Sequence, residues 1–113
     1  MILITGAAGY IGSYLIEKIA NQIGTENIRA VDSFETGSVK QIGNVSVQYC
    51  DLTNENEVKQ IVEDVDVIVH CAAISDIPTC EQNSDRAVRS NLLSIWHLLE
   101  EGRKHQLKRI IFP

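Results

Sequence analysis

The chain has 113 residues, of which 44% are hydrophobic and 22% are charged, and its formal net charge is −5. These values are typical of one globular domain with a single core, and no apolar run is long enough to span a membrane. An acidic chain without a basic stripe repels phosphate, which argues against a nucleic-acid partner. Because the sequence before the first predicted strand has no secretory pattern, we expect a cytoplasmic protein that binds no membrane.

The cysteines and histidines form no pattern typical of a metal site or a disulfide framework. Cys50, Cys71 and Cys80 are odd in number and include no Cys-x-x-Cys pair. The three histidines share no spacing typical of metal ligands. We therefore predict no metal site, and we expect Cys71 and His70 to be buried structural residues.

Apolar runs and helical periodicities alternate along the chain. We predict strands at 2–5, 28–32, 45–49, 66–70 and 108–112, and helices at 10–22, 54–63 and 84–103. Either Thr53 or Asn54 can cap the second helix. Strands joined by helical crossovers form a parallel sheet with both faces covered. The pattern therefore predicts a three-layer α/β fold with a doubly wound sheet, as one domain over residues 1–113.

A glycine-rich turn follows the first predicted strand. Gly6, Gly9 and Gly12 have Gly-x-x-Gly-x-x-Gly spacing. The first glycine permits a tight turn, the second lets the backbone approach phosphates, and the third lets the helix pack closely on the sheet. The N-terminus of that helix can then bind the pyrophosphate of a dinucleotide. We predict that these glycines, with Tyr10 and Ile11, bind a cofactor.

An acidic residue ends the second predicted strand. Asp32 lies 20 residues after Gly12, where a carboxylate can accept both hydroxyl groups of an adenosine ribose. The next residue, Ser33, offers no cation for a 2′-phosphate. The sequence therefore predicts NAD rather than NADP.

The order of these motifs resembles that of the extended short-chain dehydrogenase/reductase family, whose members include nucleotide-sugar epimerases and dehydratases. The resemblance covers the whole chain, and it rests on Thr5–Gly12, Val31–Ser38, Cys50–Thr53, Asp66–Ala73 and Asn91–Ser94. It implies a Rossmann-type sheet with the strand order 3-2-1-4-5. It also implies that NAD binds at the carboxyl ends of the strands, where the strand order reverses.

The resemblance implies further cofactor residues. Asp51 and Leu52 correspond to a pair that meets the adenine, and Cys71 to a residue that lines the cofactor cleft. Asn91 corresponds to a structural asparagine, and we expect it to make a buried hydrogen bond. Besides the glycine turn and Asp32, the implied cofactor residues are Ser33, Phe34, Thr36, Gly37, Asp51, Leu52, Cys71, Ala72, Ala73 and Asn91.

We assign no catalytic residue to this chain. In this family the fifth strand is followed by a Ser or Thr and then by a Tyr-x-x-x-Lys pair. This sequence ends at Pro113, directly after the predicted fifth strand. Tyr14 and Lys18 have the same spacing, but they lie on the first predicted helix. We expect them to form part of its exposed surface.

Two classes of function remain open. The first is the NAD-binding portion of an NAD-dependent epimerase or dehydratase that acts on a nucleotide sugar by transient hydride transfer. The second is a stand-alone dinucleotide sensor, or a non-catalytic subunit completed by a partner. A methyltransferase-like function fits the acidic end of the second strand but not the glycine spacing.

The predicted helix 84–103 has two distinct faces. An apolar stripe should pack against the sheet, and a second face with Leu93 and Trp96 is expected to form a homodimer interface. The residues of the apolar stripe are Val88, Asn91, Leu92, Ile95, Leu98, Leu99 and Gly102.

Overall fold

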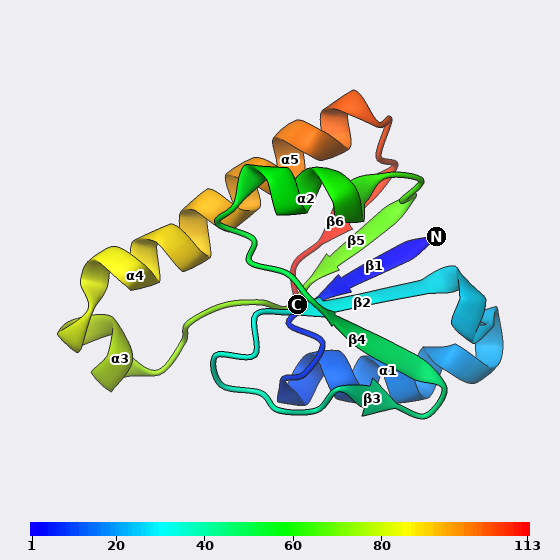
Figure 1. Cartoon of the computed structure of the whole chain (residues 1–113), viewed down its shortest axis with the longest axis horizontal. Coiled ribbons are helices and arrows are strands. Elements are labelled where there is room, and N and C mark those ends of the chain that lie inside the picture. Colours follow the sequence, from blue (N-terminus) through cyan, green and yellow to red (C-terminus); the bar gives the residue numbers. More distant parts are fainter.

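Six strands form one sheet with helices on both faces (Figure 1) in the computed structural model, which describes residues 1–113. The strands are β1 (Ile2–Thr5), β2 (Ile28–Asp32), β3 (Gln41–Ile42), β4 (Val45–Tyr49), β5 (Val67–His70) and β6 (Arg109–Ile111). Their order is β3-β4-β2-β1-β5-β6. All neighbouring pairs are parallel except β3 and β4. The five parallel strands confirm the expected order 3-2-1-4-5.

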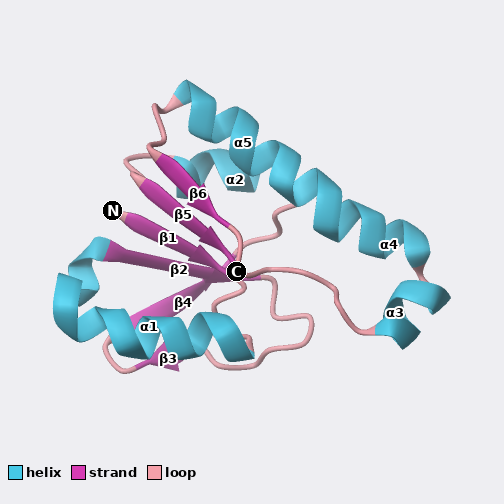
Figure 2. Ribbon diagram, turned by 180° about the vertical axis from the view of Figure 1, so that it is seen from behind, coloured by secondary structure: helices cyan, strands magenta, loops and turns pink.

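The helices confirm the three-layer arrangement. They are α1 (Tyr10–Ile23), α2 (Glu55–Val62), α3 (Ile77–Gln82), α4 (Ser84–Val88) and α5 (Ser94–Lys104), and a π-helical stretch, Arg89–Leu93, joins α4 to α5. One face of the sheet is covered by α1 and the other by α2 and α5, whereas α3 and α4 extend beyond the carboxyl ends of the strands (Figure 2). Of the two candidate caps of α2, Asn54 is the N-cap, and its side chain accepts the N–H of Asn56.

Two hydrophobic cores lie on the two faces of the sheet. Leu3 and Ile68 pack with Val58 on the side of α2 and α5. Their chain neighbours Ile4 and Val69 instead pack on the side of α1. Successive side chains of a strand point to opposite faces, so each central strand contributes to both cores. This is why β1 and β5 are nearly continuous apolar runs rather than alternating ones.

The apolar stripe predicted for helix 84–103 is wrong in part. Of the predicted stripe residues, only Leu98 and Gly102 are buried. Ser94 and Glu101 are also buried, although the predicted stripe did not include them. The π-helical stretch has more residues per turn than an α-helix, and it breaks the regular periodicity between α4 and α5. The stripe residues that are exposed are Val88, Leu92 and Leu99.

The prediction also omitted three short elements, namely β3, α3 and a 3₁₀ helix at Thr25–Asn27. The N-cap of α3 is Asp76, whose side chain accepts the N–H of Thr79 at 3.0 Å. Pro78 follows near the helix start. This cap and proline are the local pattern that could have identified α3.

No helix of the structure combines the length and the apolar character that crossing a membrane requires.

A cluster of charges joins the amino ends of the central strands. The carboxylate of Asp66, just before β5, accepts the amino group of Met1 at 2.7 Å and lies 2.6 Å from Nζ of Lys108. The hydrogen bond from Lys108, followed by that from the amino group, lowers the pKa of Asp66 to about 2.

We predict that Asp66→Asn lowers the urea midpoint at pH 7, because the folded state loses two charge-assisted contacts. A carboxyl group with a lowered pKa stabilises the fold above its unfolded pKa of about 3.9, and this stability is lost as the pH falls toward 2. The difference from wild type should therefore shrink below about pH 4. Glu55→Gln, which removes an exposed pair with Lys59, is the control and should have a smaller effect. Equal midpoints for wild type and Asp66→Asn at pH 7 would contradict this account.

Candidate functional site

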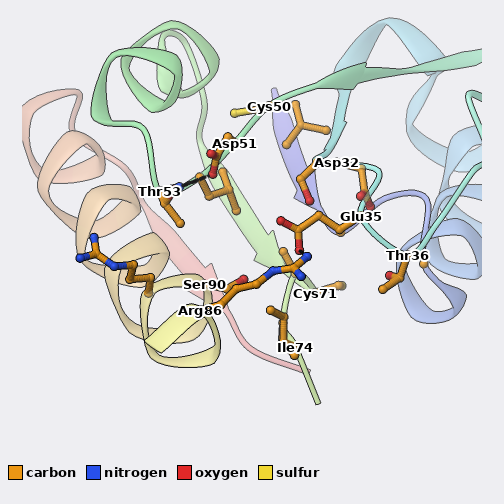
Figure 3. A pocket seen from close by; sticks show the side chains of 18 of the residues that line it. Asp32, Glu35, Thr36, Cys50, Asp51, Thr53, Cys71, Ile74, Arg86 and Ser90 are labelled. Carbon is orange, nitrogen blue, oxygen red and sulfur yellow. Dashed lines mark hydrogen bonds and ion pairs between the residues drawn. The ribbon is translucent and has the colours of Figure 1, made fainter. Parts of the chain in front are cut away.

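An open cleft of about 350 Å³ lies at the carboxyl ends of the parallel strands (Figure 3). Its walls come from the segments that follow β1, β2, β4 and β5, and from α4. Strand order reverses between β1 and β5, since β2 lies on one side of β1 and β5 on the other. Ligands of open α/β sheets bind at such a position.

Most of the expected cofactor residues line this cleft, although they come from four separate segments of the chain. The lining residues among them are Gly6, Gly9, Asp32, Ser33, Thr36, Asp51, Leu52, Cys71, Ala72 and Ala73. The others lie outside the lining, namely Tyr10, Ile11, Gly12, Phe34, Gly37 and Asn91.

The glycine turn brings three backbone segments into direct contact. Gly6 has a φ of 65°, and a Cβ atom there would lie 2.6 Å from the amide nitrogen of Ala72. A Cβ atom on Gly12 would lie 2.3 Å from the carbonyl oxygen of Gly6. At Gly9 the nearest atom to such a Cβ would be that same oxygen, at 3.3 Å. Gly6 and Gly12 are therefore required by packing, whereas Gly9 lines the cleft and is less crowded, with one close backbone contact.

The side chains of Tyr10 and Ile11 project into solvent, with exposed fractions of 90% and 54%. They begin α1, and the first N–H groups of a helix have no partner within the helix. These residues can therefore contribute backbone N–H groups to an anion, but not side chains to the cleft.

Asp32 fixes the loop after β2 to the glycine turn. Its carboxylate accepts the N–H groups of Ala8 at 2.9 Å and Phe34 at 2.8 Å. A Cβ atom on Gly37 would lie 2.5 Å from the carbonyl oxygen of Ala8, so the same loop packs directly on the turn. Phe34 itself packs against the core beside α1. Phe34 and Gly37 thus support the cleft wall, while Asp32 retains lone pairs for further hydrogen bonds.

The opposite wall is held by hydrogen bonds within the segment after β4. The Asp51 carboxylate accepts both the backbone N–H of Thr53 at 2.9 Å and its hydroxyl at 2.8 Å. The preceding residue, Cys50, is buried. Its burial, followed by the nearby charges of Glu57 and Asp51, raises the pKa of its thiol to about 12. The thiol is therefore protonated at neutral pH and contributes packing rather than nucleophilic chemistry.

The third wall begins at a buried histidine. Nδ1 of His70 lies 2.7 Å from the hydroxyl oxygen of Thr5, which also accepts the N–H of Ala72 at 3.4 Å. Burial lowers the pKa of His70 to about 4, so the ring is neutral at pH 7. Cys71 is half-buried rather than buried as expected, and this partial burial raises the pKa of its thiol. These contacts fit the structural role expected of His70, and no group of three or more potential ligands could hold a metal ion.

Asn91 makes the structural hydrogen bonds expected of it. Its side chain accepts the N–H of Ile74 and donates to the carbonyl oxygen of Ile74, both at 2.8 Å. The segment after β5 is thereby attached to the π-helical stretch. Asn91 acts on the cleft through Ile74, which lines it.

Sequence reasoning missed the wall that α4 contributes. Arg86 lines the cleft and pairs with Glu35, from the loop after β2, at 2.5 Å. Arg89 also lines it and pairs with Asp85 at 3.0 Å. No sequence pattern relates Glu35 to Arg86, because 51 residues separate them and α4 is set apart from the strands.

Tyr14 and Lys18 lie on the exposed surface of α1, as expected. Nζ of Lys18 is 5.0 Å from the centre of the Tyr14 ring, a cation–π contact at the surface. Neither residue lines the cleft.

A model of the NAD dependent epimerase/dehydratase family matches residues 2–113. The chain is 27% identical to an uncharacterized membrane protein of Methanocaldococcus jannaschii, over 97% of this chain and 34% of that protein. Among solved structures, UDP-glucose 4-epimerase of Thermotoga maritima with UDP-glucose has a TM-score of 0.90 and 25% identity. That match covers 98% of this chain and 36% of the epimerase.

A variant of uronate dehydrogenase from Agrobacterium tumefaciens, complexed with NAD, has a TM-score of 0.78 and 32% identity. The match covers 98% of this chain and 39% of the dehydrogenase. The chain thus spans little more than a third of the length of these relatives.

We predict that Asn91→Ala lowers the free energy of unfolding by about 1–3 kcal/mol, because the N–H of buried Ile74 loses its partner and the carbonyl group of Ile74 keeps only the weak donor Sγ of Cys80. Chemical denaturation measures this loss. Gln82→Ala removes an exposed amide from α3 and is the control, expected to change stability by less than about 0.5 kcal/mol. Equal stability of the two variants would show that the bonds to Ile74 do not hold the segment.

Proposed function

The chain belongs to the NAD dependent epimerase/dehydratase family, and on this basis we propose that it binds NAD in the cleft at the carboxyl ends of its strands. The observation that carries the proposal is the glycine turn. Gly6 and Gly12 bring three backbone segments into contact, and Gly9 lines the cleft without a side chain, so that a phosphate could approach its backbone.

The residues of the cleft fit this cofactor. Phosphate oxygens would be held by the N–H groups at the start of α1, where the helix dipole favours an anion. The ribose hydroxyls of the adenosine would donate to Asp32, which offers acceptors and no cation. This is why we propose NAD rather than NADP. Asp51 and Leu52 would border the adenine, and Cys71, Ala72 and Ala73 would border the other half of the cofactor.

When bound, NAD supplies a hydride acceptor for oxidation of a sugar carbon. We propose that residues 1–113 bind and orient this cofactor, and that the base for the sugar hydroxyl is supplied by residues outside them. Support comes from the cleft itself, where burial keeps both Cys50 and Cys71 protonated and His70 is sealed beneath the lining. Residues 1–113 alone should therefore bind NAD without turnover.

For the substrate we propose a nucleotide sugar. The support is the likeness to the Thermotoga maritima epimerase, whose structure contains UDP-glucose. A second candidate, a uronate, is supported by the higher identity to uronate dehydrogenase. A dinucleotide-binding subunit completed by a partner, and a cytoplasmic location, also stay proposals.

We predict that Gly9→Val weakens NAD binding at least about tenfold, because the branched side chain occupies the space left for phosphate. Circular dichroism should be unchanged, since a Cβ atom at this position meets only one oxygen, at 3.3 Å. Asp32→Ala should also weaken NAD binding and remove the preference over NADP. Calorimetric titration measures the NAD affinity of Gly9→Val and the NAD and NADP affinities of Asp32→Ala. The control is Tyr14→Phe, on the exposed face of α1. Wild-type NAD affinity in a folded Gly9→Val protein would refute the proposed site.

We also propose that the chain pairs with a second copy through α4 and α5. Trp96 is exposed as expected, with an exposed fraction of 61%, whereas Leu93 is half-buried and does not belong to the exposed set. We call the exposed set the outer stripe, and it consists of Val88, Leu92, Trp96 and Leu99. Two of its members, Trp96 and Leu99, are three residues apart in α5 and therefore share one face of that helix.

We predict that Trp96→Glu shifts the population toward monomer in sedimentation velocity, because an unpaired charge in a desolvated interface is costly. Far-UV circular dichroism should be unchanged. Gln82→Glu adds the same charge to the exposed surface of α3 and should leave the sedimentation profile as in wild type. A profile unaltered by Trp96→Glu would rule out the outer stripe as an interface.

A further inference from the structure

Two ion pairs occupy both cationic side chains of the cleft lining. Arg89 pairs with Asp85 four residues earlier on the same helical segment. Arg86 instead pairs across the cleft with Glu35, from the loop that follows Asp32 (Figure 3). The lining also contains Asp32 and Asp51, so its carboxylates outnumber its guanidinium groups. The cleft therefore presents no free cation to a ligand phosphate.

The two partners of the Glu35–Arg86 pair are held by their own elements. Arg86 lies in the first turn of α4, where its N–H donates to the side chain of Asn83. The loop that carries Glu35 is fixed by the hydrogen bonds of Asp32 to Ala8 and Phe34. The guanidinium is thus placed near the acidic end of β2 by the fold, and it is neutralised there by Glu35.

We propose that Glu35 strengthens the discrimination against NADP by engaging Arg86, so that the guanidinium is unavailable to a 2′-phosphate. This inference rests on the proposed binding of NAD. A ribose held at Asp32 shares the cleft with Glu35 and Arg86, so a phosphate on that ribose experiences both charges. With Glu35 present, the pair is neutral and Asp32 repels the phosphate. Without Glu35, Arg86 becomes a free planar donor of the kind that binds phosphate in a bidentate manner.

Wild type and three variants test this role of Glu35, because they differ stepwise in the net charge at positions 35 and 86. The charge is +1 in Glu35→Gln, zero in wild type and in the double variant Glu35→Gln/Arg86→Gln, and −1 in Arg86→Gln. Calorimetric titration with NADP should give the tightest binding for Glu35→Gln, by about fivefold over wild type. The double variant should return to the wild-type affinity, and Arg86→Gln should bind NADP more weakly than wild type.

The same titrations with NAD distinguish charge from damage to the cleft. NAD affinity should change less than about twofold in Glu35→Gln, because NAD has no group at the 2′ position beyond the hydroxyl. The gain in NADP affinity should also shrink when salt is raised from about 0.05 M to 0.5 M, since screening weakens exposed charges. Because Asp32 is retained, the preference for NAD should narrow without inverting.

Asp85→Asn is the matched control, since it removes a carboxylate from the same lining and frees Arg89 instead. It should raise NADP affinity less than Glu35→Gln does, because that pair does not reach the loop after β2. An equal gain would show a general charge effect and would overturn the role of Arg86. A gain that persists in the double variant, or an unchanged ratio in Glu35→Gln, would overturn the inference while NAD binding stands. Failure of wild type to bind NAD would overturn the proposed function and this inference together.

Discussion

The rest of the structure depends on the close approach of three backbones at the carboxyl end of β1. Gly6 turns there with a positive φ against the chain that leaves β5, and Gly12 brings the start of α1 onto Gly6. No side chain fits at either contact, since a Cβ atom would approach backbone atoms to 2.6 Å or less. This packing places the N-terminus of α1 against the turn at the carboxyl end of β1. The cleft exists because the helix is brought this close to the sheet.

Polar side chains then hold the remaining walls at the same end. Asp32 attaches the loop after β2 to the glycine turn, Thr5 attaches β1 to His70 and Ala72, and Asn91 attaches the chain after β5 to the helical layer. Each bond joins segments that are distant in the sequence. A buried polar group that loses its partner lowers the stability of the fold. These hydrogen bonds therefore stabilise the fold and also hold the walls of the cleft in place. The residues that stabilise the fold therefore also shape the cleft.

The sequence was sufficient for the sheet because its strands are buried on both faces and are bounded by turns. The segments 2–5, 28–32 and 45–49 appear as β1, β2 and β4 with the predicted bounds. It was insufficient for helix 84–103, where the π-helical stretch displaces the periodicity on which the stripe depended. The short β3 was missed because two residues carry too little pattern. Side-chain pairs across the cleft, above all Glu35 with Arg86, depend on tertiary placement that no local spacing encodes.

The central claim is that one cleft, built on the glycine turn, binds NAD with its phosphates at the start of α1. Amide chemical-shift mapping of the isotope-labelled chain during titration with NAD tests it most directly. We expect the largest shifts to fall on residues 9–12, 32–37 and 71–74, and we expect them to saturate together. Shifts confined to the surface groove near Arg29 and Tyr49, with the glycine turn unaffected, would contradict it.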